Sequence, residues 1–261
     1  MAIGVFVVST LVGSMFLLAV QPYSGIDPAV LSLVQFGPAL GAAVTWLVVR
    51  RTVTAALPAA VSVRRVGWVA VAIIVVCVAF GALIIGAAVV AGVAPVGPVA
   101  VEGVSFGVFV LLQLLGAGGE EIGWRGVMQP VLESRTTRFV AVAITGATWT
   151  LWHVQAFTLG PVVAICFIVS TMSFAIVLGD LSVGSFRQRV LIAAIGHWLI
   201  NIACYLLAGD NTFDQPQVVF IAVAAVFIAV AAVLVAATVP GARRWVQQAR
   251  KGTVVARATG S

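Results

Sequence analysis

Long apolar runs are the feature that most constrains how this chain can fold. A helix crosses the hydrocarbon core of a bilayer with roughly 20 consecutive apolar residues. Eight stretches of about that length follow one another along the 261 residues. They are Ala2–Val20, Ala29–Val49, Val66–Gly92, Val104–Met128, Phe139–Phe157, Val162–Leu178, Val190–Leu207 and Val218–Val239. Because a bilayer offers backbone groups no water, each run predicts a spanning α-helix.

The composition excludes a soluble protein. Hydrophobic residues make up 62% of the chain and charged residues only 8%, whereas soluble domains carry about 25% charged residues. Such a chain lacks the polar side chains that would cover a soluble fold. No internal repeat or long linker divides it. We therefore predict an all-α, polytopic integral membrane helical bundle of about eight transmembrane helices, with residues 1–261 as a single transmembrane domain.

The basic residues predict the topology. With eight spans and a cytoplasmic N-terminus, every Lys and Arg except Arg125 falls on the inner side, as the positive-inside rule requires. These residues are Arg50, Arg51, Arg64, Arg65, Arg135, Arg138, Arg187, Arg189, Arg243, Arg244, Arg250, Lys251 and Arg257. The outer loops carry Asp27, Glu102, Asp210 and Asp214. We expect a multi-pass protein of a bacterial plasma membrane, with both termini cytoplasmic and the first run retained as a span.

The net charge of +6 comes from the same loops. It indicates attraction to anionic lipid headgroups, and no nucleic-acid-binding module accompanies it. Cys77, Cys166 and Cys204 fall inside spans, where we expect them to pack as small apolar residues. The small-residue patches suit internal packing and a dimer equally, so the sequence fixes no oligomeric state.

A few ionisable residues lie within the apolar runs, where they cost several kcal/mol unless they are paired. They gather in three short segments on three different spans. These segments are Gly119-Glu120-Glu121-Ile122-Gly123-Trp124-Arg125, Trp149-Thr150-Leu151-Trp152-His153 and His197-Trp198-Leu199-Ile200-Asn201. His153 and His197 are the two histidines of the chain. Polar residues inside a span are functional candidates by default.

Helical spacing suggests how these residues are used. Glu121 and Arg125 are four residues apart, so they share a face and can form an ion pair. Glu120 is turned about 100° away and has no cation on its own helix, which suits a general base. His197 and Asn201 are also four apart and project from one face. Glycines on the fourth span, Gly116, Gly118, Gly119 and Gly123, let a neighbouring helix approach closely.

Each feature also has a structural interpretation. An intramembrane histidine or asparagine can simply bond a neighbouring helix. A Glu–Arg pair can serve only to fix helix packing. Tryptophans such as Trp149 are more often packing residues or interface anchors. It is the joint occurrence of the three segments that favours a functional site.

The three segments resemble the signature of the CPBP family, which covers CAAX-type prenyl endopeptidases and the bacteriocin-processing or self-immunity proteins of the Abi group. That signature is Glu-Glu-x-x-x-Arg, Phe-x-x-x-His and His-x-x-x-Asn or Asp. Here it is Glu120-Glu121-x-x-x-Arg125, Trp149-x-x-x-His153 and His197-x-x-x-Asn201. The resemblance covers a peptidase core of about residues 104–207. Trp149 departs from the usual Phe, which bears on the shape of the substrate site.

The resemblance implies an intramembrane endopeptidase acting on a membrane-associated peptide or protein, whether lipidated or not. It implies that Glu120 and His153 activate a water, and that His197 and Asn201 stabilise the oxyanion. Glu121 and Arg125 would hold the site together. A non-catalytic membrane immunity or partner-binding protein and a small-solute transporter are the alternatives.

The cofactor stays undecided between none and a divalent metal such as zinc. One carboxylate and two imidazoles, from Glu120, His153 and His197, would suit zinc, which takes three protein ligands and a water. The chain lacks the His-Glu-x-x-His motif that preorganises two such ligands on one helix. Metal-free activation of water by a glutamate explains the same residues.

Overall fold

The chain folds into a bundle of helices. The computed structural model describes the backbone of residues 1–238 and the side chains of residues 1–234. The helices are α1 (Ala2–Val20), α2 (Gly37–Ala56), α3 (Val63–Val90), α4 (Phe106–Gly123), α5 (Gln129–Glu133), α6 (Arg138–Trp152), α7 (Pro161–Leu181), α8 (Phe186–Ala208) and α9 (Gln217–Thr238). Short 3₁₀ turns lie at η1 (Gln21–Tyr23), η2 (Leu33–Phe36) and η4 (Val154–Thr158), and η3 (Trp124–Met128) is π-helical. Residues 1–238 form no strand, which confirms the all-α prediction.

Within the described residues, seven helical stretches are long and apolar enough to cross a membrane. The predicted fifth span, Phe139–Phe157, is the exception. Its helix, α6, has 15 residues and stops at Trp152, short of the roughly 20 residues that a span needs. His153 leaves helical geometry with φ −85° and ψ 61°, and η4 follows it. Because the apolar residues continue past Trp152, the sequence pattern did not show where the helix ends.

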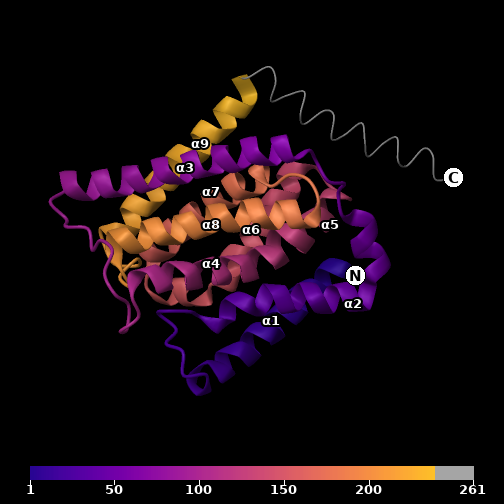
Figure 1. Cartoon of the computed structure of the whole chain (residues 1–261), viewed down its shortest axis with the longest axis horizontal. Helices are drawn as coiled ribbons and strands as arrows, with labels where there is room; N and C mark the ends of the chain where they lie inside the picture. Colours follow the sequence, from indigo (N-terminus) through magenta and orange to yellow (C-terminus); the bar gives the residue numbers. More distant parts are fainter. Residues whose placement is uncertain (239–261) are drawn as a thin grey trace.

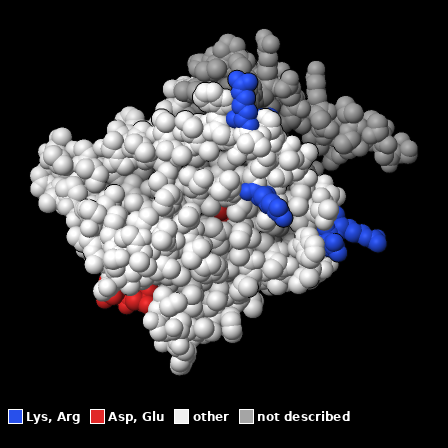
Figure 2. All heavy atoms as spheres, viewed as in Figure 1, with Lys and Arg blue, Asp and Glu red and all other residues white. Residues whose placement is uncertain are grey.

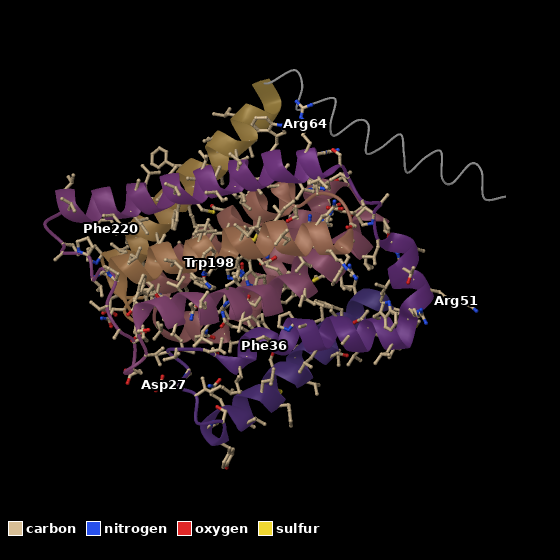
Figure 3. All side chains as sticks on the ribbon, viewed as in Figure 1. Asp27, Phe36, Arg51, Arg64, Trp198 and Phe220 are labelled. Atoms are coloured by element: carbon tan, nitrogen blue, oxygen red, sulfur yellow. The ribbon has the colours of Figure 1, made fainter. Side chains whose placement is uncertain are left out.

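The helices run back and forth between two ends of the bundle (Figure 1). The short helix α6 also runs antiparallel to α7. Arg138 at the start of α6 donates to the carbonyl oxygens at the end of α7, so these two helix ends lie together. Figure 3 shows Arg51 and Arg64 toward the right-hand end and Asp27 and Phe220 toward the left-hand end. We call these the arginine end and the acidic end of the bundle. Figure 2 shows most of the red side chains of the visible face at its lower left and the blue ones toward its top, middle and right.

Two of the arginines predicted to lie in loops are in fact part of the packed bundle. Arg189 lies on α8, is 2% exposed, and donates from Nη1 and Nη2 to the Glu133 carboxylate at 3.1 Å each. Arg138 lies 3.4 Å from Glu133 and donates to the carbonyl oxygens of Gly179, Asp180 and Ser182. Helix α8 begins four residues before the predicted Val190 because Ser185 and Gln188 form a capping box. The predicted basic tail, Arg243 to Arg257, lies outside the described residues.

Three of the four glycines on α4 provide the predicted close approach, whereas a Cβ on Gly118 would meet nothing within 4 Å. A Cβ on Gly119 would lie 2.7 Å from the ring of Phe36, and one on Gly123 would lie 2.6 Å from the carbonyl oxygen of Pro38. A Cβ on Gly116 would overlap the side chain of Gln35. The start of the second span was predicted too early, because α2 begins at Gly37 and η2 precedes it. The glycine face therefore brings η2 and the start of α2 against α4.

Candidate active site

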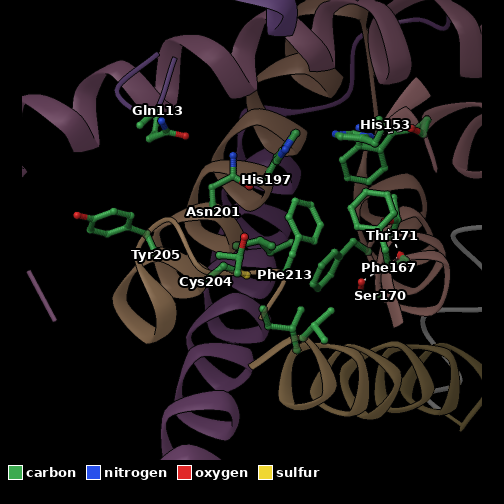
Figure 4. Close-up of a pocket in the computed structure, with 18 of the residues that line it drawn as sticks. Gln113, His153, Phe167, Ser170, Thr171, His197, Asn201, Cys204, Tyr205 and Phe213 are labelled. Atoms are coloured by element: carbon green, nitrogen blue, oxygen red, sulfur yellow. Dashed lines mark hydrogen bonds between the residues drawn. The ribbon is translucent and has the colours of Figure 1, made fainter. Parts of the chain in front are cut away.

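A cavity of about 280 Å³ lies within the bundle and holds four of the predicted site residues on its wall. Trp149 and His153 come from the end of α6, and His197 and Asn201 come from the middle of α8. Figure 4 shows His197 and Asn201 one turn apart on their helix, with His153 beside Phe167 across the cavity. The rest of the wall is Ala29, Phe109, Gln113, Phe167, Ser170, Thr171, Phe174, Ile200, Cys204, Tyr205, Gly209, Thr212, Phe213, Val218 and Ile221.

Glu121 joins two helices beneath the cavity. Its Oε1 accepts from Arg125 Nη1 at 2.9 Å, as the spacing predicted, and it also lies 2.9 Å from His197 Nδ1. Glu121 is fully buried and Arg125 is 1% exposed. A carboxylate only accepts, so Nδ1 of His197 must carry the hydrogen. Glu121 thereby fixes the orientation of the imidazole and leaves its Nε2 for the cavity side.

His153 is held in the same way by a backbone group. Its Nδ1 lies 2.9 Å from the carbonyl oxygen of Trp149, one turn earlier on α6. A carbonyl oxygen also only accepts, so Nδ1 is the donor and Nε2 of the neutral ring keeps a lone pair. The ring packs against Trp152 and Phe167, with centroid separations of 4.8 and 5.2 Å. A histidine with Nε2 free in a cavity can take a proton from a water or from a substrate.

Trp149 links the site together. Its indole Nε1 donates to Glu120 Oε2 at 2.7 Å, and its ring lies 5.1 Å from that of His197. The Arg125 guanidinium stacks over the same indole at 4.6 Å, a cation–π contact. We had predicted packing or an interface anchor for Trp149, not a hydrogen bond. A phenylalanine, the usual residue in the resembling signature, could not donate to Glu120.

Gln35 is a site residue that the sequence analysis missed. Its Nε2 lies 3.4 Å from Glu120 Oε1, a long hydrogen bond that reaches across from η2 to α4. Gly116 makes room for this side chain. Gln35 is a polar residue inside the predicted second span, so the rule that singled out Glu120 also applied to it.

The predicted site residues thus fall into two groups. His153, His197, Asn201 and Trp149 line the cavity, whereas Glu120, Glu121 and Arg125 lie behind its wall. Glu120 is 2% exposed, and the indole of Trp149 contacts it from the cavity side. The Asn201 side chain makes no hydrogen bond to the described residues, so its amide is free to bind a ligand in the cavity.

The residues considered for zinc do not fit a metal site in this arrangement. Among the described residues, no group of three or more His, Cys, Asp or Glu side chains is placed to hold a metal ion. The two histidines face the cavity, but both oxygens of Glu120 are turned toward Trp149 and Gln35. We therefore derive no step that passes through a metal.

Replacing Trp149 by phenylalanine is expected to lower the free energy of unfolding by about 1–3 kcal/mol, because it leaves a buried carboxyl oxygen of Glu120 without its donor. The measurement is denaturant unfolding of the purified protein in detergent. Trp68→Phe is the matched control, because Trp68 is 61% exposed and the same chemical change occurs there without a buried partner. Equal stability of the two variants would show that the Trp149–Glu120 bond contributes nothing.

Comparison with known proteins shows a similarity that covers the helices of this site. Residues 102–203 match the family model described as type II CAAX prenyl endopeptidase Rce1-like. A relative from Methanococcus maripaludis, CAAX prenyl protease 2, is 30% identical over 129 residues, which cover 44% of this chain and 47% of the relative. The match therefore spans about half the length of that relative.

The matched region contains every residue of the three motifs, from Glu120 to Asn201. It runs from the residues just before α4 to the second half of α8, which includes the helices that hold His153 and His197. The peptidase core of about residues 104–207 that the motifs indicated stays a prediction. Residues 102–203 are therefore similar to the Rce1-like type II CAAX prenyl endopeptidases.

Proposed function

We propose that this protein is an intramembrane endopeptidase that hydrolyses a peptide bond in a membrane-associated substrate. The observation that carries the proposal is the convergence of His153, His197 and Asn201 on one cavity, with Trp149 linking that cavity to the carboxylate of Glu120. The match of residues 102–203 to the Rce1-like family model and the similarity to a CAAX prenyl protease support the same reaction class.

In the proposed mechanism, a water in the cavity attacks the scissile carbonyl carbon. Glu120, with His153, takes the proton from that water as the new C–O bond forms. The carbonyl oxygen becomes an oxyanion, which the Asn201 amide and a protonated His197 stabilise by donating hydrogen bonds. The tetrahedral intermediate then breaks its C–N bond, and the proton passes to the leaving amine. The products are a carboxylate and an amine.

The mechanism requires a small movement. Glu120 lies behind Trp149, so the indole must shift for the carboxylate to reach a water in the cavity. Substrate binding against the cavity wall is the natural cause of such a shift, because the indole is itself part of that wall.

The enclosure of Glu120 is also the one observation that favours a second candidate function. If Trp149 never moves, the cavity can still bind a peptide without cleaving it. Such a protein would act as a membrane immunity or partner-binding protein, and Glu120 would then serve only to hold α4 against α6.

The test compares membrane-protein termini by mass spectrometry in a deletion strain that expresses either wild type or Glu120→Gln at matched levels. Hydrolysis predicts new termini with wild type alone, and those termini define the cleavage rule. Identical termini in the two strains, with both proteins restoring the strain's phenotype, would reject catalysis and favour the binding function. The protein level in purified membranes is the control for folding of the variant.

A further inference from the structure

The cavity extends from the histidines toward one end of the bundle. Beyond His197 and Asn201 its wall continues with Cys204 and Tyr205 in the last turn of α8. It then includes Gly209, Thr212 and Phe213 in the loop before α9, and Ala29 in the loop between α1 and α2. These two loops also contain Asp27, Asp210 and Asp214, so the cavity reaches the acidic end of the bundle.

Buried side chains close the other direction. Trp124, Arg125 and Met128 are each 1% exposed, and Glu121 is fully buried. Further along lies the Glu133–Arg189 ion pair described above. No residue from the loops of the arginine end, residues 57–62, 134–137 or 182–185, lines the cavity. Of the two ends of the bundle, the lining therefore favours the acidic end as the way to His153 and His197.

The difference in charge between the two ends predicts which side of the membrane each end faces. Arg50, Arg51, Arg64, Arg65 and Arg135 belong to the arginine end, and the loops of the acidic end contain neither Lys nor Arg. Short loops rich in arginine stay in the cytoplasm during insertion. The acidic end, and the cavity with it, then face the extracytoplasmic side.

We propose that the cavity receives its substrate from the extracytoplasmic side, and that the substrate is an uncharged, apolar segment of an exported or membrane-anchored protein. The cavity wall supports this chemistry, because it combines five aromatic rings of Phe and Trp with aliphatic side chains and contains no Asp, Glu, Lys or Arg. A Lys, Arg, Asp or Glu side chain bound beyond the histidines would lose its hydration there without meeting an acidic or basic side chain of opposite charge. The substrate class rests on the proposed function, whereas the side of access does not.

The test is cysteine accessibility in a full-length chain whose three native cysteines are replaced by alanine. Thr212→Cys probes the mouth of the cavity and Ser170→Cys probes its interior, where Ser170 is 4% exposed and serine is close to cysteine in size. Asp27→Cys and Arg51→Cys are the exposed controls for the two ends. The probe is a membrane-impermeant methanethiosulfonate, applied to intact cells and separately to inverted membrane vesicles.

We expect the cysteines at positions 27, 212 and 170 to react in intact cells, and the cysteine at position 51 to react only in inverted vesicles. Reaction at position 51 in intact cells with loss of reaction at position 212 would overturn the proposal. Reaction at position 170 only from the side of position 51 would overturn it as well. If either cavity variant fails to accumulate, the pair at positions 27 and 51 still decides the orientation.

The outcome is independent of catalysis. The cavity cysteines could react from outside while wild type and Glu120→Gln give the same termini. This result would reject the peptidase and leave an outward-facing binding cavity. If the peptidase is correct, the Glu120-dependent termini must lie in extracytoplasmic segments. Termini confined to cytoplasmic segments would overturn the proposed substrate class even where cleavage is established.

Discussion

Glu120→Gln is expected to lower kcat by about 10²–10⁴-fold on a peptide taken from the wild-type cleavage site, because a glutamine cannot take a proton from water. The fold should survive the change. The amide oxygen of the glutamine can still accept from Trp149 Nε1, the bond that Glu120 makes at 2.7 Å. The measurement is the initial cleavage rate of the purified protein in detergent or in proteoliposomes, together with its unfolding transition.

Glu102→Gln is the matched control, because Glu102 is an exposed carboxylate in a loop. This variant should cleave the peptide at the wild-type rate. A Glu120→Gln variant that retains the control's rate while folding normally would remove Glu120 from the mechanism. A variant that loses activity only because it unfolds would leave the Trp149–Glu120 contact as a structural bond. Rate and stability measured on the same sample separate these two results.

The bundle of apolar helices could be predicted because it depends on one coarse quantity, apolar length. Apolar length reflects the exclusion of water from a bilayer and does not depend on how side chains meet. The resemblance to the family followed from the order of three motifs, which is also local information. The bounds of α7 and α9 differ from the predicted spans by three residues or fewer for the same reason.

The predictions that failed depended on hydrogen-bond partners. Helix α6 ends at Trp152 although the apolar run continues, and its end is marked by a bond between His153 Nδ1 and a backbone oxygen. Arg189 looked like a loop charge but is buried because Glu133 neutralises it from another helix. A hydropathy value describes each residue separately, so it gives no information about a hydrogen-bond partner that lies 56 residues away in the sequence.

The site was predicted in part for the same reason. The Glu121–Arg125 pair lies within one helix, so its spacing was enough to predict it. The contacts of Glu121 with His197 and of Glu120 with Trp149 join different helices, and no spacing rule reaches them. The glycines at 116, 119 and 123 indicated close approach to α4, but the sequence did not show that the approaching residue would be Gln35.

Glu121→Gln is expected to lower the free energy of unfolding by about 3–5 kcal/mol, which is a far larger effect on stability than we expect from Glu120→Gln. The carboxylate of Glu121 is the anionic partner of both the buried Arg125 guanidinium and the His197 ring. A neutral amide leaves the guanidinium as an uncompensated charge in the apolar interior, and it cannot accept from both donors through one oxygen as strongly as a carboxylate does. Denaturant unfolding in detergent measures the loss.

A second substitution distinguishes a charge effect from a packing effect. In the double variant Glu121→Gln with Arg125→Met, the unpaired charge is gone, and most of the lost stability should return because a paired charge and a well-packed apolar residue of similar volume are nearly equivalent inside a protein. A double variant that is no more stable than Glu121→Gln would show that the loss came from packing around Trp149, over which Arg125 stacks. If the stability returns, the two adjacent glutamates differ by the 100° between them on the helix, which directs Glu121 to Arg125 and His197 and Glu120 toward the cavity wall.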